Sequence, residues 1–311
     1  MLQKIYKVEI VTPVHNRREL TLNCLKSLKE LNWKNISHHV IVVDDGSSDG
    51  TSEAIRLEFP EVQLVLGDGT LWYTGGMNAG INAALYHNPD YILAINDDTT
   101  FDKDCLQELV RCAENHPNSI VGALLCCIDD PLRVLQVAPQ WDTWYGGWHH
   151  SRTLTRDALP KVPFEVKSIV GNCVLYPVRA IKMVGLMDMK TFPHAYSDID
   201  YSAKMHKEGF RLIIQPKALV YCFPNVLFPP LKTLSLSKLI DTLIHDRHKN
   251  ENVVMQFHSR LRTAPSITIG LASFAIYIVR MTLKALSLGG SWPCWPDPKP
   301  GVERTDAKSA E

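Results

Sequence analysis

Two adjacent carboxylates, Asp97 and Asp98, end the apolar run in the segment ILAINDDTT, residues 92–100. Like charges side by side repel each other, so a fold tolerates them in open solvent or where a cation joins them. At the end of a buried strand, such a pair is placed to hold a hard divalent cation and, through it, a diphosphate. The alternative is a solvated turn with a helix cap, since Asp102 and Asp104 follow.

A second apolar run ends in the same way, in the segment VVDDGSSDG, residues 42–50. A carboxylate of Asp44 or Asp45 could accept hydrogen bonds from a nucleobase N–H or from ribose hydroxyls. The alternative is a tight turn that caps the next helix. Because Asp49 is placed to provide that cap, we expect Asp44 and Asp45 to have no purely structural role.

The elements that must position these carboxylates follow from hydrophobic periodicity. Short apolar runs alternate with helical patterns of about a dozen residues, which predicts an α/β fold with a largely parallel sheet. The predicted strands span 7–13, 39–47, 62–67, 91–96 and 119–127, and the predicted helices span 16–31, 48–59, 75–87 and 102–116. Ligands bind beyond the carboxyl ends of such strands, so the segments there should converge on one crevice. They read TPVHNR, DDGSSDG, GDGTLWYTGG and NDDTT.

The second half of the chain is less regular. The pattern breaks down from about 128 to 165, and periodicity returns with VKSIVGNCVLYP, a helix near 178–185, a helix over 198–210 and a strand over 211–222. The remainder is mainly helical to about 288. We therefore expect a main domain over 1–228, with a donor half to about 127 and an acceptor half from about 128, then a helical region over 229–290 and a mobile tail over 291–311.

Composition excludes several classes of protein. The chain has 311 residues, and 33 Lys and Arg balance 33 Asp and Glu, so no basic field calls for nucleic acid. The eight cysteines show no C-x-x-C pair and no zinc spacing, which indicates reduced, mostly buried thiols in a cytosolic protein. No G-x-G-x-x-G follows the first strand, which excludes an NAD-dependent dehydrogenase. The first residues lack the apolar core of a signal peptide.

The segment over 263–279 comes closest to a membrane span. It has 17 residues between Arg262 and Arg280 and contains Pro265 and Gly270, whereas a spanning helix needs about 20 mostly apolar residues. We expect a buried helix, or a helix lying in the plane of a membrane surface with Arg280 and Lys284 along it.

Six motifs together carry a family resemblance. They read TPVHNR, VVDDGSSDGT, GDGTLWYTGGMNAGI, AINDDT, VGNCVLYPVRAIKMVGLMD and YSDIDYSAKMHKEGF, in that order over roughly residues 5–223. In this the chain resembles the family-two glycosyltransferases with the GT-A fold, in particular the rhamnosyltransferase-like branch that builds bacterial surface polysaccharides. The resemblance implies a mixed, mostly parallel central sheet and sugar transfer from a nucleotide diphosphate donor.

The resemblance also assigns roles to individual positions. It implies that Asp98 is the ligand of a divalent cation, magnesium or manganese, and that Asp97 lies nearer the ribose and sugar. Gly171 and Asn172 fall on the acceptor side. The positions implied to bind the donor are Pro13, Arg17, Asp44, Asp45, Trp72, Gly76, Asn78, Asn96 and Asp97.

The catalytic base is implied by the segment SDID. The family carries EDxD at the start of a helix, and its second position is the base. Here Ser197 replaces the acidic residue and Asp198 falls at the base position, while Asp200 is expected to cap or brace the helix. The alternative for Asp198 is capping alone. One carboxylate on the acceptor side gives a single displacement and hence inversion, whereas a hydrolase would need two flanking carboxylates.

One departure from the family concerns the metal. Many relatives place a histidine where this chain has Cys222, and a neutral thiol is a poor ligand for magnesium. Either Asp98, the diphosphate and water hold the cation, or another group such as His245 or His248 substitutes. Ser197 and Cys222 also support an alternative function, a catalytically impaired module that binds a sugar nucleotide or glycan.

The segment WDTWYGGWHH, residues 141–150, has two interpretations. Aromatic rings stack on the apolar faces of sugars, so Trp141, Trp144, Tyr145 and Trp148 could line the acceptor cleft. They could equally form an aromatic cluster that pins an irregular hairpin.

The expected partners follow from these assignments. They are a nucleotide-sugar donor and a glycan or lipid-linked glycan acceptor, with rhamnose and thymidine diphosphate favoured by the resemblance alone. The C-terminal helices, which carry Arg260, Arg262, Arg280 and Lys284, could rest on the inner face of the cytoplasmic membrane or pair in a homodimer. We expect a cytoplasmic enzyme that is peripheral on that membrane.

Overall fold

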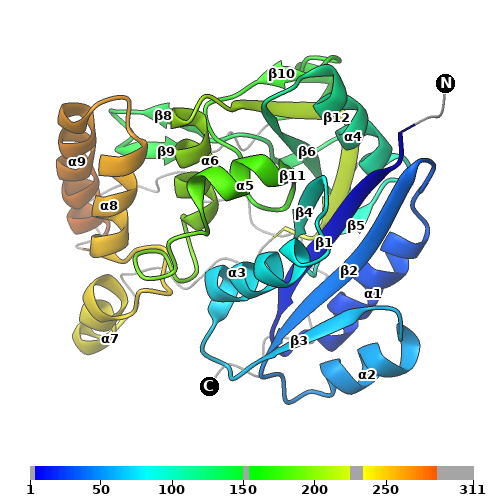
Figure 1. The fold of residues 1–311 in the computed structure, drawn as a ribbon. Helices are drawn as coiled ribbons and strands as arrows, with labels where there is room; N and C mark the ends of the chain where they lie inside the picture. Colours follow the sequence, from blue (N-terminus) through cyan, green and yellow to red (C-terminus); the bar gives the residue numbers. More distant parts are fainter. Residues whose placement is uncertain (1–3, 150–153, 225–233, 286–311) are drawn as a thin grey trace.

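The computed structural model describes residues 4–149, 154–224 and 234–285 (Figure 1). The predicted mobile tail over 291–311 lies outside the described residues. Seven of the cysteines lie within them. All seven are free thiols and six are buried, which confirms the prediction of reduced, mostly buried cysteines.

A ten-stranded mixed sheet forms the centre of the molecule. Along its main path the order is β10-β12-β6-β11-β4-β1-β2-β3, with β5 paired to β12 and β7 paired to β6. β3, β2, β1 and β4 pair in parallel, as do β6 and β12, and β11 runs antiparallel between these two groups. The strands are β1 (Tyr6–Val14), β2 (Ile36–Asp45), β3 (Gln63–Gly67), β4 (Tyr91–Ile95), β5 (Thr100–Phe101), β6 (Ser119–Cys127), β7 (Val134–Gln136), β10 (Phe164–Glu165), β11 (Cys173–Pro177) and β12 (Arg211–Cys222).

Helices cover both faces of this sheet and bury two separate cores. Successive strand residues point to opposite faces, so Ile10 packs with one core and Val11 with the other. The first face is covered by α1 (Arg18–Lys29), α2 (Thr51–Glu58) and α4 (Cys105–Asn115), and the second by α3 (Trp72–Leu85), α5 (Val178–Val184) and α6 (Ser197–Lys207). This three-layer arrangement confirms the predicted α/β fold with a mostly parallel sheet.

The parallel strands end at one edge of the sheet. Val14 of β1 aligns with Asp44 of β2, and β4, which pairs with β1 on its other side, ends at Ile95 immediately before Asn96. The segments that follow these strands are therefore neighbours, as the sequence predicts.

The C-terminal helices lie to one side of the sheet, at the left of Figure 1. They are α7 (Leu236–Ile240), a π-helical turn η3 (Asp241–His245), α8 (Val253–Thr263) and α9 (Ile267–Ala285); α8 packs on α9 and on α6. α9 begins two residues after Pro265. Within the described residues, no helix combines the length and the apolar character that crossing a membrane requires.

The aromatic segment folds as a hairpin, β8 (Gln140–Asp142) and β9 (Gly147–His149), with the short 3-10 turn η1 (Arg156–Ala158) beyond it. Trp141 and Trp148 face each other across the strands with ring centroids 5.4 Å apart, and the Trp148 indole N–H donates to Thr263 Oγ1 at 2.7 Å. Arg280 lies over the ring of Tyr145, 4.0 Å from its centroid. These contacts favour the hairpin-pinning interpretation, and acceptor binding by Trp141 stays a prediction. Trp144 is 85% exposed, and its role in acceptor binding stays a prediction.

Candidate active site

A guanidinium joins the two adjacent carboxylates. Arg17 follows β1, and its Nη1 lies 2.7 Å from Asp97 Oδ1 while its Nη2 lies 2.8 Å from Asp98 Oδ2. The two carboxylates and Arg17, which were predicted from separate motifs of the sequence, therefore meet at one place. Of the two explanations for the acidic pair, a solvated turn or a joining cation, the structure supports the cation.

The two aspartates differ in environment. Asp97 is almost fully buried, whereas Asp98 keeps 21% of its side chain exposed. Burial raises the pKa of Asp97 to about 7, and the neighbouring Asp98 adds to the rise, although Arg17 opposes it. A carboxyl group whose pKa lies near 7 beside a guanidinium is typical of a functional site.

The donor set suits a hard divalent cation. Carboxylate oxygens are the ligands that magnesium and manganese prefer, and such sites use one or two carboxylates together with substrate phosphates. In the described part of the chain, neither Asp97 nor Asp98 belongs to a cluster of three or more His, Cys, Asp or Glu ligand atoms. His245 instead pairs with Asp241, and His248 Nδ1 lies 3.0 Å from Asp246 Oδ1. The contacts of these histidines therefore point away from a role as third ligand.

A short relay of contacts connects this pair to the predicted base. The Asn96 amide donates to Asn172 Oδ1, and the backbone N–H of the preceding residue, Gly171, donates to Asp198 Oδ2 at 2.8 Å. Asn96 directly precedes Asp97 in the chain. Contacts of the loop at 171–172 therefore link Asp198 to Asn96, although 102 residues separate the two in sequence.

Asp198 stands in the first turn of α6. Its Oδ1 accepts the N–H of Ile199 at 2.8 Å within that turn, whereas the N-cap of the helix is Tyr196, which makes no side-chain cap hydrogen bond. Burial nevertheless raises the pKa of Asp198 above that of an ordinary aspartate, although the N–H groups of Gly171 and Ile199 oppose the rise. A carboxylate with raised proton affinity is suited to accept a proton.

Gly171 is required next to Asp198. A Cβ at this position would lie 2.6 Å from Tyr73 Oη and 3.3 Å from Asp198 Cβ. Tyr73 is the second residue of α3, and its burial together with the nearby Asp198 charge raises the pKa of its phenol. Tyr73 was missed in the sequence, because nothing in its spacing distinguishes it from a core aromatic residue.

Buried polar atoms without a partner gather around this site. Within the described residues, five buried side-chain nitrogen or oxygen atoms make no hydrogen bond. Such atoms are rare in native proteins. One is Asn96 Oδ1, and three more belong to residues directly adjacent to Pro13, Asp98 and Asp198. Only Ser273 lies elsewhere; the others are Thr12, Asn96, Thr99 and Ser197. Acceptors and hydroxyls left open in this way are suited to contact a bound polar molecule.

The carboxylate pair Asp44 and Asp45, at the end of β2, has structural contacts that the sequence did not predict. Asp44 accepts the Ser47 N–H at 2.9 Å and the Ser52 hydroxyl, and Asp45 accepts the N–H groups of Gly69 at 2.8 Å and Trp72 at 2.9 Å. Both residues therefore have structural contacts, and the expectation that their role is not purely structural stays a prediction. Asp45 holds the loop that leads into α3, and contact of Asp44 with a base stays a prediction.

The segment GGMNAG forms part of helix α3, within the helix predicted over 75–87. Gly76 packs against the sheet, because a Cβ there would lie 2.7 Å from Pro13 Cβ. Asn78 donates to Met187 O at 2.9 Å and accepts the Met187 N–H at 3.0 Å. These buried contacts give Gly76 and Asn78 packing and bracing roles, and donor contact at either position stays a prediction.

Trp72 begins α3 with a strained backbone. Its φ of +55° is a genuine outlier for a bulky residue, and such strain is concentrated at functional sites. Its ring stacks on His248, with centroids 3.6 Å apart, and meets the edge of His194. The two histidines around Trp72 were not predicted as its neighbours, since they come from a loop and from the C-terminal region.

A second unpredicted contact closes the loops beyond β1 and β2. Asn16, whose φ is +50°, donates its N–H to Ser47 Oγ at 2.8 Å and accepts the Ser48 N–H at 2.7 Å. The segment after β1 that carries Arg17 is thereby fixed to the segment that carries Asp44. Asparagine in a left-handed conformation was the available sequence signal, because few other residues adopt it readily.

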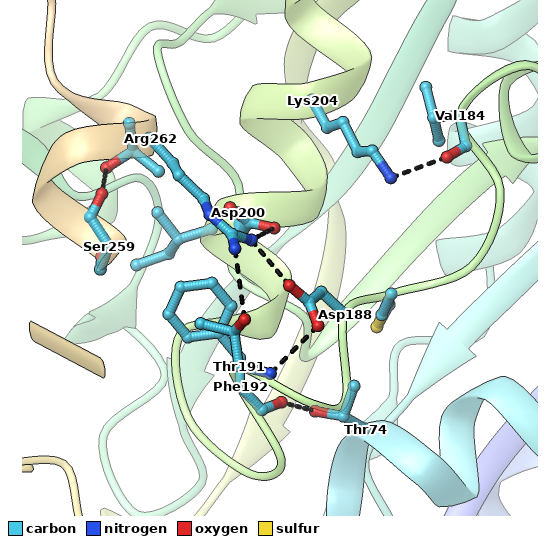
Figure 2. Close-up of polar contacts among 12 residues, drawn as sticks. Thr74, Val184, Asp188, Thr191, Phe192, Asp200, Lys204, Ser259 and Arg262 are labelled. Atoms are coloured by element: carbon cyan, nitrogen blue, oxygen red, sulfur yellow. Dashed lines mark hydrogen bonds and ion pairs between the residues drawn. The ribbon is translucent and has the colours of Figure 1, made fainter. Parts of the chain in front are cut away.

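The helix that carries Asp198 is held from the C-terminal region (Figure 2). Arg262 of α8 lies 2.8 Å from Asp188 and 3.6 Å from Asp200, and it donates to Thr191 Oγ1 at 3.2 Å. Asp200 thus braces α6, as expected from the sequence. The same loop is tied to α3, because the Thr74 hydroxyl donates to the carbonyl of the residue after Thr191 at 2.6 Å.

Comparisons with known proteins identify the family and the fold. The model of the family "Glycosyl transferase family 2" matches residues 9–184. The galactofuranosyltransferase GlfT1 of Mycolicibacterium smegmatis is 28% identical over 188 residues, which cover 58% of this chain and 60% of that protein. The chain thus spans less than two thirds of this relative.

Two solved structures share the fold. GalNAc-T7 superposes with a TM-score of 0.58 at 13% identity, covering 92% of this chain and 58% of that one. The mannosyltransferase PcManGT of Pyrobaculum calidifontis gives a TM-score of 0.54 at 17% identity, covering 94% of this chain and 78% of that one. The fold is therefore GT-A-like. Because the family model spans more than half of the sequence, the chain belongs to glycosyl transferase family 2.

Proposed function

We propose that this chain is an inverting glycosyltransferase, which moves a sugar from a nucleotide diphosphate donor to a hydroxyl of a glycan or lipid-linked glycan. The observation that carries the proposal is the relay from Asp97 through Asn96, Asn172 and Gly171 to Asp198. This relay supports the assignment of the carboxylate pair to the donor and of the single carboxylate to the acceptor.

In the proposed reaction, Asp198 takes the proton from the acceptor hydroxyl as that oxygen attacks the anomeric carbon. The raised pKa of Asp198 supports this role, because general-base help is greatest when the pKa lies near the working pH and is worth about 10²–10⁴-fold. Arg17 offers positive charge beside the position proposed for the diphosphate. One carboxylate on the acceptor side supports inversion.

We propose that Asp98, together with Asp97, holds a magnesium or manganese ion. When bound, the ion neutralises the charge that grows on the departing diphosphate. GalNAc-T7 was solved with UDP, GalNAc and Mn²⁺, and PcManGT with GDP-Man and Mn²⁺, which supports a nucleotide-sugar donor and a divalent cation here. Donor contacts are proposed for Pro13, Asp44, Trp72 and Asn96. Rhamnose as the sugar rests on the motif resemblance alone.

The acceptor side of the proposal includes a membrane surface. α9 exposes Ile267, Leu271 and Val279, three apolar residues separated by four and eight positions and hence on one side of the helix. We propose that this side rests on the cytoplasmic membrane that carries a lipid-linked acceptor. Flotation with anionic vesicles, compared between the wild type and Leu271→Lys, tests it. Concentration-dependent dimerisation that Leu271→Lys abolishes, without flotation, would replace the membrane by a homodimer.

A screen of nucleotide sugars tests the proposed activity. The wild type should be stabilised thermally by one donor in the presence of Mg²⁺ or Mn²⁺ and should release the nucleoside diphosphate when an acceptor is added. Asp198→Asn should keep the donor-induced stabilisation and lose transfer. Asp157→Asn, at an exposed carboxylate of η1, is the matched control and should behave as the wild type. Donor binding without turnover by the wild type would instead support the impaired binding module.

A further inference from the structure

Two histidine side chains contact one carboxylate oxygen of Glu9 at the other end of β1, away from the candidate active site. Glu9 lies in β1, His39 lies at the aligned position of β2, and His87 follows α3. The Nδ1 atom of each histidine lies 3.0 Å from Glu9 Oε2, and the two imidazole centroids are 4.8 Å apart in an edge-to-face arrangement. One ligand atom from each residue lies within 4.8 Å of the other two.

The position of Glu9 is unusual for a carboxylate. Val11 and Ile41 belong to the core beneath α3, and Glu9 and His39 continue the same sheet face two residues earlier in each strand. The alternation therefore assigns an apolar residue to this place, yet Glu9 is there and only 6% exposed. A buried carboxylate is tolerated when it is paired with cationic groups or coordinates a metal.

We propose that Glu9, His39 and His87 bind one divalent transition-metal ion of the Zn²⁺, Co²⁺ or Ni²⁺ type. Ligand atoms bonded to one such ion at about 2.0–2.1 Å lie roughly 3 Å apart, as the carboxylate oxygen and each Nδ1 do here. Two imidazoles with one carboxylate suit these ions, whereas magnesium prefers oxygen ligands alone. The site therefore differs in metal preference from the Asp97–Asp98 pair.

The ion would fasten three elements that are far apart in sequence. β1 and β2 are already paired, whereas His87 reaches this cluster through its contact with Glu9 and its ring contact with His39, so a shared ion would fix the C-terminal end of α3 to the sheet. Both histidines are partly exposed, which leaves room for water in the remaining coordination positions. Each neutral imidazole would carry its proton on Nε2 and offer the Nδ1 lone pair to the ion.

Cobalt titration of the full chain, freed of metal by a chelator and carrying no polyhistidine tag, tests the proposal. We expect visible ligand-field absorption that saturates at one equivalent and a rise in the thermal midpoint with Zn²⁺. His87→Ala should weaken this binding more than about 10-fold, because removal of even an outer-shell partner costs 10–100-fold. His87 follows the end of a helix and is partly exposed, so this variant should fold.

Two controls separate this site from the candidate active site. Asp98→Asn should keep the cobalt spectrum and the zinc-induced stabilisation, and His87→Ala should keep any stabilisation by a nucleotide sugar with Mg²⁺. The proposal is overturned if the wild type shows no saturable cobalt band, or if the band survives in His87→Ala and His39→Asn but disappears in Asp98→Asn.

Discussion

Arg17 Nη1 lies 2.7 Å from Asp97 Oδ1, which makes a side chain of the protein the cation that joins its own acidic pair. Arg17 also reaches Asp98 and retains 40% of its side-chain exposure. A partly exposed guanidinium can move without unfolding the site, whereas the nearly buried Asp97 cannot follow it. One guanidinium thus balances part of the charge of the two carboxylates, and the exposed part of Asp98 stays accessible to an incoming divalent cation.

Substitution of Arg17 by Gln should lower the stability of the protein and increase its response to divalent cations. Without the guanidinium, two adjacent carboxylates repel each other, and Asp97 is left buried without its charged partner. We expect Mn²⁺ to raise the thermal midpoint of Arg17→Gln more than that of the wild type, because the ion replaces the missing positive charge.

Arg18→Gln is the control for this prediction. Arg18 is the next residue along the chain, and its recorded ion pair is with Glu19 on the protein surface. The Mn²⁺-induced shift of Arg18→Gln should equal that of the wild type. If Arg17→Gln and Arg18→Gln gave the same shift, the cation would not bind at the Asp97–Asp98 pair.

Asp97→Asn should change the pH dependence of stability in a defined direction. The folded-state pKa of about 7 lies above the unfolded value of about 3.9, so the contribution of Asp97 is fully present below pH 4 and is lost as pH rises through 7. Asparagine does not ionise, so relative to the wild type this variant should gain about 2 kcal/mol between pH 5 and pH 8. Urea unfolding at several pH values measures the difference, and Asp157→Asn should show none.

Much of the fold could be predicted from the hydrophobic periodicity and from the residues at the strand ends. Ile10 and Val11 alternate between two cores, so strands buried on both faces read as continuous apolar runs and could be located from the sequence. The position of the antiparallel β11 between two parallel groups could not be predicted, because strand order depends on contacts between distant segments. The carboxylates after β2 and β4 were found because a charge directly after a buried strand is conspicuous.

The backbone contacts of polar residues at the site could not be predicted, for one physical reason. Polar side chains near a crevice can bind a ligand or satisfy the backbone of the protein itself, and the residue type does not decide between them. Asp45 and Asn78 are occupied by backbone groups of Trp72 and Met187. The position of Glu9 beneath α3 was equally invisible, because its partners are 30 and 78 residues away in the chain.

The pH profile of transfer should report the raised pKa of Asp198. A general base is active when deprotonated, so kcat/KM should fall as pH decreases through its folded-state pKa. Because burial raises that pKa, the acidic limb should lie above the value of an ordinary aspartate, about 3.9. An acidic limb at or below that value would contradict the assignment of Asp198 as a buried base. The limb should be measured at saturating metal, so that metal binding does not contribute.

Gly171→Ala should impair transfer by displacing Asp198. The new Cβ would lie 2.6 Å from Tyr73 Oη and 3.3 Å from Asp198 Cβ, so the loop at 171 or one of these side chains must move. A displacement of about 1 Å at a reacting group can cost 10²-fold in rate. We expect a lower kcat with little change in donor affinity.

A second substitution tests the mechanism of this effect. Tyr73→Phe removes the hydroxyl that the new Cβ would meet, so Gly171→Ala combined with Tyr73→Phe should recover part of the lost kcat relative to Gly171→Ala. Tyr73→Phe alone provides the reference for that comparison. Equal rates in the single Gly171→Ala variant and the double variant would show that the clash with Tyr73 is not the cause.

Arg262→Met should weaken both the fold and the positioning of the base. Arg262 links α8 to Asp188 and to Asp200 of the helix that carries Asp198, and loss of a charged hydrogen bond costs about 1.5–3 kcal/mol. Although burial opposes it, hydrogen bonds from Arg262 and Thr191 lower the pKa of Asp188 to about 2. The stability that this pair contributes is present above pH 4 and lost as pH falls toward 2.

The difference in unfolding free energy between the wild type and Arg262→Met should therefore be largest above pH 4 and shrink below it. Lys204→Met is the matched control. Lys204 lies on α6, the helix that carries Asp198 and Asp200, and donates to the carbonyl of Val184 (Figure 2). It should cost less stability and leave kcat unchanged, whereas Arg262→Met should lower kcat more than it raises KM for the donor. If both variants lowered kcat equally, the effect would reflect general loosening of α6 and not the contact of Arg262 with Asp188 and Asp200.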